Sequence, residues 1–335
     1  MRLKPLREQV IVITGATSGI GLATARMASD CGARLVIAAR NEEALQAVVA
    51  EIQNKGGEAV SVIADVGREA DVNRIKDEAI RRFGGFDTWI NNAAVSIYGR
   101  LDEVSIEDMQ RLFDTNFWGQ VYGSRAALSH FRDRGTPAKL INMGSVLGER
   151  AIPIQGIYSA SKHAVAGFTE SFRMEIDAAG LPVSVTLIKP SAIDTPYKDH
   201  AKNYLDEAPK NPPPVYDVRV VARAILYACE HDRRDITVGG AGRLINLASS
   251  MAPRMSDRVM TRIMPYLQQS RDPAGPRDHN NLYAPQDDLE ERSNYPFALK
   301  SSLYTQASLH PLAAVGMAAV AVALAAGVIR ARQKL

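Results

Sequence analysis

Tyr158 and Lys162 stand four residues apart, and Tyr158 follows Ser145 by 13 residues. In a helix, this spacing places the phenol and the ammonium on one face. A phenol is a poor acid or base near neutral pH, but a neighbouring cation favours the phenolate and lowers the pKa. The Ser145 hydroxyl can hydrogen-bond the same substrate oxygen. These side chains predict proton transfer to or from a carbonyl or alcohol, although Tyr-x-x-x-Lys alone is usually an ordinary helix-surface pair.

A glycine-rich turn at residues 14–21 follows a short apolar run and precedes a helical pattern. Glycine permits a tight turn and a close approach of the backbone to a pyrophosphate, whose charge is stabilised by the helix N-terminus. The turn therefore predicts a dinucleotide site, with a purely structural turn as the alternative. Its candidate cofactor contacts are Thr14, Gly15, Thr17, Ser18, Gly19, Ile20 and Gly21.

The end of the second expected strand indicates which dinucleotide binds. A carboxylate there would bond the ribose hydroxyl of NAD and repel the 2′-phosphate of NADP. Residues 38–41 contain no carboxylate and include Arg40. A planar guanidinium suits a phosphate monoester, so we expect NADP(H) to be preferred over NAD(H). The alternative is that Arg40 is simply solvated. The absence of a carboxylate would then be the sole indication of NADP(H).

The elements that must position these residues alternate between strand and helix. Short, almost continuously apolar runs predict strands covered on both faces, at 10–14, 34–39, 59–64, 88–91, 139–143, 183–188 and 236–238. Helical patterns occupy 20–31, 42–55 and 70–83, and Ser105 with Asp108 forms a capping pattern for another. This alternation predicts an α/β fold, a doubly wound parallel seven-stranded sheet with helices on both faces.

Composition narrows the class of protein. The chain has 335 residues, 46% apolar and 23% charged, which is typical of a globular protein with a substantial core. A net charge of +3 does not indicate a nucleic-acid partner. Cys31 and Cys229 form neither a metal-ligand spacing nor a disulfide framework and fit a reducing compartment as buried small residues; we expect no metal site. The N-terminus lacks the apolar core of a signal peptide, so we expect a cytoplasmic catalytic domain.

The ordered motifs together resemble the short-chain dehydrogenase/reductase family, in its simple, non-extended branch. The resemblance extends from about residue 6 to about residue 240. It rests on Thr14–Gly21, Asp65-Val66, Asn91-Asn92-Ala93-Ala94, Asn116, Ser145, Tyr158-x-x-x-Lys162 and Pro190–Thr195. Two positions depart from the family pattern, because Ala94 and Ser191 each replace a usual glycine.

The resemblance implies a role for each catalytic residue. Tyr158 would be the general acid in reduction and the base in oxidation, and Lys162 would lower its pKa and hold the nicotinamide ribose. Ser145 would orient the reacting oxygen. Asn116 would anchor a water that links the lysine to solvent, whereas read alone it is a capping or core amide.

Further cofactor contacts are implied by the same resemblance. Asp65 and Val66 would line the adenine pocket, although a lone aspartate after a strand is usually a helix cap. The loop after the fourth strand would pass beside the cofactor, and the segment after the sixth strand would reach the nicotinamide. These positions are Asn92, Ala93, Ala94, Pro190, Ile193 and Thr195.

The resemblance places substrate selection in a loop at 190–215, which contains Tyr197, His200 and Tyr204. His200 is interpreted as a surface or pocket-lining residue rather than a second acid or base. Apolar neighbours of the serine, Val146, Leu147 and Ile152, favour a lipophilic substrate. We expect an NADP(H)-dependent ketoreductase that interconverts a ketone or aldehyde and an alcohol, as a homodimer or homotetramer. The alternative is a catalytically idle NADP-binding sensor or a membrane-anchored scaffold.

The pattern changes beyond the catalytic domain, expected at 1–245. We expect an amphipathic helical extension at 246–271, whose helix 253–269 would be a lid, a membrane-surface helix or a packed helix, and a polar, poorly ordered linker at 272–310. An apolar helix follows at 311–330, and its uncharged run 312–329 would be about 27 Å long, close to the hydrocarbon core of a bilayer at about 30 Å. Membrane anchorage and helix–helix packing are the two interpretations. The cations that follow the run oppose a membrane-spanning orientation. A helix that lies shallowly at the membrane surface is therefore a third interpretation.

Overall fold

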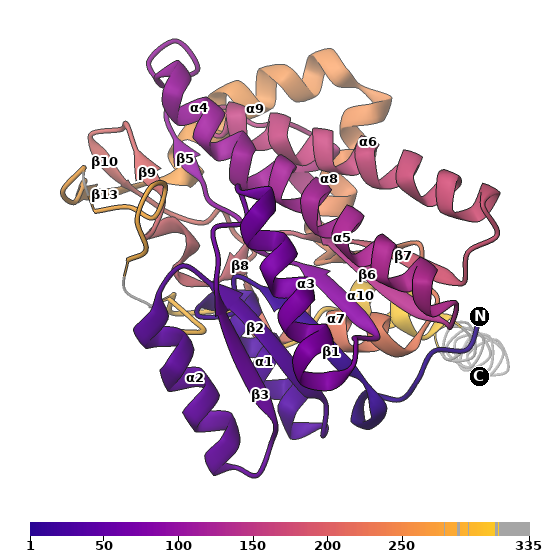
Figure 1. Ribbon diagram of the computed structural model, residues 1–335. Helices are drawn as coiled ribbons and strands as arrows, with labels where there is room; N and C mark the ends of the chain where they lie inside the picture. Colours follow the sequence, from indigo (N-terminus) through magenta and orange to yellow (C-terminus); the bar gives the residue numbers. More distant parts are fainter. Residues whose placement is uncertain (278, 287–288, 294, 312–313, 315–335) are drawn as a thin grey trace, which may run out of the picture.

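The computed structural model describes residues 1–277, 279–286, 289–293, 295–311 and 314. At its centre is a seven-stranded sheet in the order β12-β7-β6-β4-β1-β2-β3 (Figure 1). All of its pairings are parallel, which confirms the expected fold class. The strands are β1 Val10–Thr14, β2 Arg34–Ala39, β3 Ala59–Ile63, β4 Thr88–Asn91, β6 Ala138–Met143, β7 Val183–Pro190 and β12 Asp235–Val238.

Helices cover both faces of this sheet (Figure 1). Ile11 and Ile13 of β1 pack in a core cluster with α1, α2 and α7, whereas Val10 and Val12 pack with α3, α5 and α6. Because both faces of β1 are buried, the strand is apolar at successive positions instead of alternating. The six helices are α1 Gly19–Asp30, α2 Glu42–Asn54, α3 Glu69–Phe83, α5 Gly119–Arg134, α6 Gly156–Ala178 and α7 Val218–Glu230.

Further elements complete the described part of the fold. The Ser105 hydroxyl accepts a hydrogen bond from the Asp108 N–H at 3.2 Å, so the expected cap begins α4. Cys229 is buried as expected, but Cys31 is exposed after α1. The remaining elements are η1 Leu6–Glu8, β5 Ile97–Tyr98, α4 Ile106–Phe113, the π-helical turn η2 Asp114–Trp118, η3 Val146–Gly148, β8 Ile193–Asp194, η4 Pro196–Lys198, β9 Lys202–Asn203, β10 Glu207–Pro209, β11 Tyr216–Asp217, α8 Gly240–Met251, α9 Pro253–Gln268, β13 Gln269–Pro273 and α10 Leu303–Leu309.

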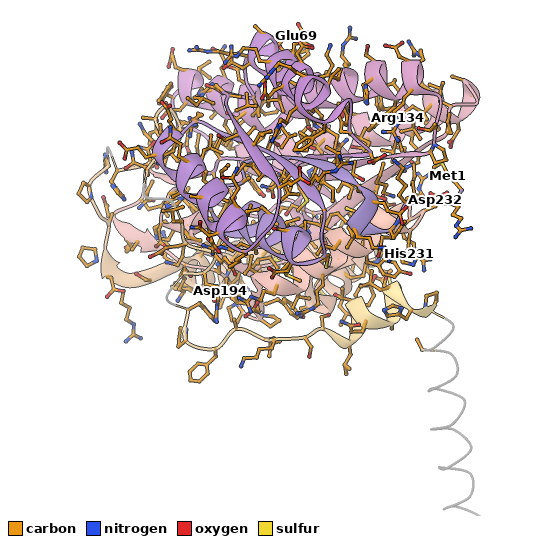
Figure 2. The ribbon with its side chains drawn as sticks, turned by 60° about the horizontal axis from the view of Figure 1, so that its bottom comes forward. Met1, Glu69, Arg134, Asp194, His231 and Asp232 are labelled. Atoms are coloured by element: carbon orange, nitrogen blue, oxygen red, sulfur yellow. The ribbon has the colours of Figure 1, made fainter. Side chains whose placement is uncertain are left out.

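Strand order determines where a ligand can bind. The order reverses between β4 and β1, and in an open α/β sheet the crevice outside the carboxyl ends at such a point is the usual binding site. Asp194, which follows β7, lies on the opposite side of the molecule from Met1 and Asp232, which precede β1 and β12 (Figure 2). The carboxyl ends and the amino ends of the strands therefore lie on opposite sides of the molecule. The glycine turn lies at the carboxyl ends.

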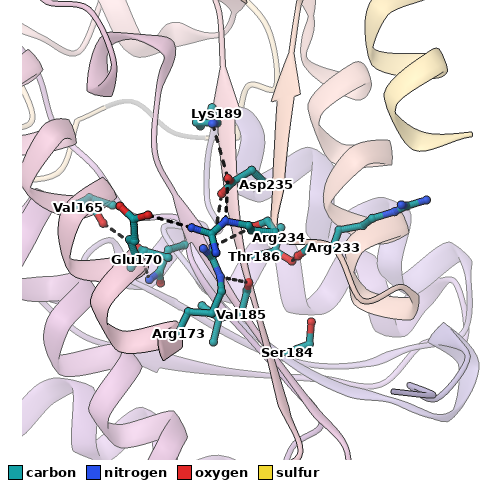
Figure 3. A network of polar contacts seen from close by, with 12 residues as sticks. Val165, Glu170, Arg173, Ser184, Val185, Thr186, Lys189, Arg233, Arg234 and Asp235 are labelled. Atoms are coloured by element: carbon teal, nitrogen blue, oxygen red, sulfur yellow. Dashed lines mark hydrogen bonds and ion pairs between the residues drawn. The ribbon is translucent and has the colours of Figure 1, made fainter. Parts of the chain in front are cut away.

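A polar network attaches α6 to the sheet (Figure 3). The buried Arg173 guanidinium donates to the carbonyl of Val185 at 3.1 Å and to that of Arg234 at 3.0 Å. Its ion pair with Asp235, at 3.4 Å, adds a contact to β12. Since α6 also carries Tyr158 and Lys162, these contacts help to position the helix against the strands that form the site.

The helical extension packs on the catalytic domain through one face of α9. Met260 and Met264 are buried against Ile152, so the packed interpretation holds for this face. Met255, Val259 and Ile263 are exposed on the same helix. Helix α8 spans residue 245, so the expected domain boundary falls inside a helix.

Parts of the stretch 272–310, which we expect to be a polar linker, contact the catalytic domain. Leu282 and Leu309 are buried, whereas most of the described residues in this stretch are exposed. A few apolar anchors and many long-range polar bonds, such as that from the Tyr227 hydroxyl to the carbonyl of Leu309, hold it in place. The expected apolar run 312–329 lies outside the described residues, except Ala314. Within the described part of the chain, no helix is long and apolar enough to cross a membrane.

Candidate active site

The glycine turn after β1 permits close approach of backbone to backbone. Gly15 has φ 65°, in the left-handed region that favours glycine. A Cβ on Gly21 would lie 1.9 Å from the carbonyl oxygen of Gly15, so no larger residue fits there. The local sequence therefore forms a tight bend that leads directly into α1.

Asn92 fixes this turn from the neighbouring strand. Its side-chain amide donates to the carbonyls of Thr14 and Gly15, at 2.9 and 3.0 Å. In return, the Thr14 hydroxyl accepts from the backbone N–H groups of Asn92 and Ala93, at 3.0 and 3.2 Å. Thr14 and Asn92 thus join β1 to the end of β4 at the point where the strand order reverses.

A groove of about 200 Å³ lies beside the turn. Most of the expected cofactor positions line it: Gly15, Thr17, Ser18, Gly19, Ile20, Arg40, Asp65, Val66, Asn92, Ala93, Ala94, Tyr158, Lys162 and Thr195. Four expected positions do not. Thr14 and Gly21 hold the turn itself, whereas Pro190 and Ile193 line a neighbouring cavity.

Two arginines lie at the end of the groove beside β2. Arg111 donates to the Asp65 carboxylate at 2.6 Å. Burial alone would raise the pKa of Asp65, but the hydrogen bond and charge of Arg111 outweigh it and hold that pKa below its usual value. Arg40 donates to the main-chain carbonyls of Asn281 and Leu282. This end of the groove therefore carries cationic groups close to Asp65.

Tyr158 and Lys162 both lie on α6, as their spacing predicts, and both side chains are buried. The Lys162 ammonium donates to the carbonyl of Met143 at 2.8 Å, and burial lowers its pKa to about 7. Burial likewise raises the pKa of the Tyr158 phenol, while hydrogen bonds with Tyr197 and Ser145 partly counteract this. Both groups are therefore shifted away from their charged forms by the same desolvation.

Asn116 lies in η2, a π-helical turn of the kind often found at functional sites. Its side-chain oxygen accepts from the Val95 N–H at 2.8 Å, and its amide donates to the Val95 carbonyl at 2.9 Å and to Ser161 at 3.2 Å. The side chain is completely buried and joins β4's loop to α6. The Asn116 amide is therefore satisfied by protein partners adjacent to the site, and its implied anchoring of a water stays a prediction.

A second cavity, of about 160 Å³, meets the groove at Tyr158. Both are lined by Ile20, Gly144, Tyr158, Thr195 and Tyr197. Ser145 lines the second cavity, together with the apolar residues Val146, Leu147, Ile152, Pro190, Ile193 and Pro212. The Tyr158 side chain thus faces both spaces, whereas Ser145 faces the more apolar second cavity.

Comparison with known proteins decides the family. The model of the family described as short chain dehydrogenase matches residues 9–205. The chain belongs to the short chain dehydrogenase family. It is 49% identical over 328 residues to the Uncharacterized oxidoreductase YxnA of Bacillus subtilis (strain 168), covering 97% of this chain and 92% of that protein.

Solved dehydrogenase structures share this architecture. One from Burkholderia phymatum, in complex with NAD, has a TM-score of 0.66 and 27% identity and covers 82% of this chain and 99% of that one. An alcohol dehydrogenase from Thermococcus sibiricus, complexed with 5-hydroxy-NADP, has a TM-score of 0.60 and 25% identity, with 69% and 95% coverage. The chain is accordingly an oxidoreductase acting on CH–OH or C=O groups, with a nicotinamide cofactor.

The groove of this short chain dehydrogenase has features that suit that cofactor. Thr115 is buried at the groove, and its hydroxyl has no hydrogen-bond partner among the described residues. A buried polar atom without a partner is unfavourable unless a ligand satisfies it. Together with the glycine turn, Thr115 indicates a site that is complete only when a polar ligand is bound.

Two residues of the substrate loop expected at 190–215 reach the site, and Thr115 and Ser96 join them without having been expected there. The Tyr197 hydroxyl donates to Ser96 at 2.7 Å, and its ring lies edge-on to that of Tyr158, with centroids 5.5 Å apart. His200 is buried and lines the groove, in agreement with the pocket-lining interpretation. Thr115 and Ser96 belong to no recognised motif, and only proximity to Asn116 and to the strand-end loop could have suggested them.

Proposed function

We propose that this enzyme is an NADP(H)-dependent oxidoreductase that interconverts a ketone or aldehyde and an alcohol. The observation that carries this proposal is the position of Tyr158, whose side chain lines both the groove and the apolar cavity. A proton donor at that junction can reach a substrate oxygen while the substrate carbon faces the groove. A bound nicotinamide would supply or accept the hydride.

The residues at the junction have separate roles in the direction of reduction. Ser145 donates a hydrogen bond to the substrate oxygen and orients it, and it stabilises the negative charge that develops there. Tyr158 then transfers its phenolic proton to that oxygen, and in oxidation its phenolate accepts the proton back. The Tyr197 ring lies edge-on to that of Tyr158, with centroids 5.5 Å apart, and we assign Tyr197 the orientation of the phenol.

The preference for NADP(H) rests on Arg40. It lies at the groove beside the end of β2, and residues 38–41 contain no carboxylate that would repel a 2′-phosphate. The groove's acidic side chain, Asp65, is paired with Arg111. A guanidinium can bind a phosphate monoester through charge-assisted hydrogen bonds.

The substrate class follows from the second cavity. Most of its lining surface is apolar, and its polar lining residues are the hydroxyl-bearing Tyr98, Ser145, Tyr158, Ser191, Thr195 and Tyr197 and the amides Gln155 and Asn211. Such a chamber favours a lipophilic molecule with one carbonyl or hydroxyl group. We therefore assign lipophilic ketones and secondary alcohols as the substrates to examine.

The decisive experiment follows NADPH absorbance with a panel of lipophilic and polar ketones and aldehydes, and NADP+ reduction with the matching alcohols. Turnover of lipophilic members by the wild type, and its loss in Tyr158→Phe, is the expected outcome. An idle NADP-binding sensor would bind NADPH but turn over no member of the panel. Activity that survives Tyr158→Phe would disprove the assigned role of that phenol.

Assembly and localisation are separate proposals. Trp118 and Met174 are exposed on the α5 and α6 side, and we assign that side to a homodimer or homotetramer interface. Light scattering of Trp118→Arg tests this assignment.

We assign the apolar run 312–329 to membrane contact. Cell fractionation with and without residues 311–335 tests this, since an unchanged soluble pool would exclude an anchor.

A further inference from the structure

A C-terminal segment crosses the mouth of the cofactor groove. We name it the strap, comprising described residues 281–286 and 289–293. Asn281, Pro285 and Gln286 line the groove opposite the glycine turn. We propose that the strap occupies the phosphate-binding groups of the free enzyme, so that a dinucleotide binds only when the strap releases them. This proposal rests on the proposed use of a dinucleotide.

One end of the strap engages the glycine turn. The backbone N–H of Gly19 donates to the carbonyl of Glu290 at 2.8 Å, and the Leu289 N–H donates to the carbonyl of Thr17 at 2.8 Å. Gly19 begins α1, and Ser18 makes no side-chain capping bond. The N–H groups at a helix start are the donors that an anion such as a pyrophosphate would use. The Glu290 carbonyl therefore takes a donor that the cofactor needs.

The other end engages the arginines of the groove. Arg40 donates to the carbonyls of Asn281 and Leu282, and Arg111 also donates to that of Leu282, at 3.0 Å. A neutral carbonyl is a weaker acceptor for a guanidinium than a phosphate is. A 2′-phosphate can therefore compete with the strap for Arg40.

Several contacts fasten the strap at both ends. Arg292 and Ser293 donate to the carboxylate of Asp194, which is completely buried, at 2.7 and 2.8 Å. At the far end, Leu282 is completely buried, and the Tyr283 hydroxyl donates to Asp108 at 2.7 Å. Asp194 lies between Ile193 and Thr195, so the contacts of Arg292 and Ser293 with Asp194 adjoin the nicotinamide end of the site.

The space beneath the strap is small for a dinucleotide. The groove volume of about 200 Å³ is below the roughly 300–1,000 Å³ of typical small-molecule sites. Leu289 also has φ 75°, a conformation unfavourable for an L residue with a side chain. Movement of the strap would widen the groove for the cofactor, and the strap's backbone conformation at Leu289 opposes the docked state.

A docked strap lowers the fraction of enzyme that can bind, and the apparent Kd rises in proportion. We would measure NADPH affinity and association rate by fluorescence for the wild type, Arg292→Ala and Tyr283→Phe, with Arg271→Ala on the exposed part of β13 as the matched control. Both unfastened variants should bind NADPH roughly three- to tenfold more tightly and faster. The control should match the wild type.

Tyr283→Phe keeps the test informative if Arg292→Ala fails to fold. Arg292→Ala leaves the buried Asp194 without its ion pair, whereas Asp108 keeps its bonds to Tyr204 and Lys202 when Tyr283 is replaced. Unchanged or weaker NADPH binding by a folded Tyr283→Phe would overturn the proposal, because the strap would then be neutral or part of the bound site.

Limited trypsin digestion gives a second readout. NADPH should accelerate cleavage after Arg292 of the wild type, because the displaced strap is accessible; protection by NADPH would overturn the proposal. If the wild type binds neither NADPH nor NADH, the proposed function itself fails, an outcome distinct from binding that the variants leave unchanged.

Discussion

Lys162 and Tyr158 are neighbours on α6, with the ammonium nitrogen 5.6 Å from the centroid of the phenol ring. In the free protein, the expected lowering of the Tyr158 pKa by Lys162 does not appear. Burial lowers the pKa of Lys162 to about 7 and raises that of Tyr158. Desolvation is the main cause of both shifts, because each charged form loses its water on burial.

The buried Lys162 predicts a pH-dependent stability. Between about pH 7 and the usual lysine pKa of about 10.4, the unfolded chain binds a proton that the folded protein does not. This group's contribution to the free energy of unfolding therefore rises with pH across that window, and below it the buried charge is destabilising. Urea unfolding at pH 6.5 and 9.5 should show a smaller pH slope for Lys162→Met than for the wild type. The exposed Lys300→Met is the control, and an identical slope in all three proteins would contradict the shift.

Replacement of Tyr158 by phenylalanine tests proton transfer. It removes the hydroxyl at the junction of the two cavities while keeping the ring in its packing. We expect kcat to fall roughly 10²- to 10⁴-fold, the usual range for general acid–base catalysis, with NADPH affinity little changed. Steady-state kinetics and direct binding measure the two quantities. Tyr266→Phe, on the exposed side of α9, should behave as the wild type.

Replacement of Arg40 by alanine tests the cofactor preference. Loss of one charge-assisted bond costs about 1.5–3 kcal/mol, so NADPH affinity should fall roughly 10- to 100-fold. NADH lacks the 2′-phosphate, and its affinity should not fall comparably. Titration of both cofactors with wild type and variant gives the ratio. Equal losses for NADPH and NADH would show that Arg40 does not read the phosphate.

Replacement of Thr115 by valine tests whether its hydroxyl is reserved for a ligand. Valine has nearly the same shape, and the hydroxyl it replaces is buried without a partner among the described residues. Thermal unfolding of the free enzyme should therefore be unchanged or shift upward. NADPH binding should weaken, because the ligand loses a hydrogen bond. A destabilised free enzyme would indicate that the hydroxyl already has a partner, such as a water.

Local pattern was enough to predict the framework of this protein. The expected strands at 10–14, 34–39 and 88–91 agree with the structure at both ends, and the Ser105 cap begins α4. Each depends on neighbours within a few residues: apolar runs for two-sided burial, a capping hydroxyl, and glycine where a side chain would collide. The groove lining around Gly19 and the Tyr158–Lys162 pair follow from the same local rules.

Tertiary structure alone decided what surrounds these motifs. Residues 281–293 are polar and resemble a linker, yet Leu282 is buried and Arg292 reaches Asp194, 98 residues away along the chain. The pKa directions of Tyr158 and Lys162 likewise depend on burial rather than on their spacing. Contacts between distant segments depend on the folded geometry, which no local pattern of residues encodes. The sequence by itself therefore determined the sheet, the glycine turn and the proton-transfer pair, whereas only the folded chain showed the strap across the groove.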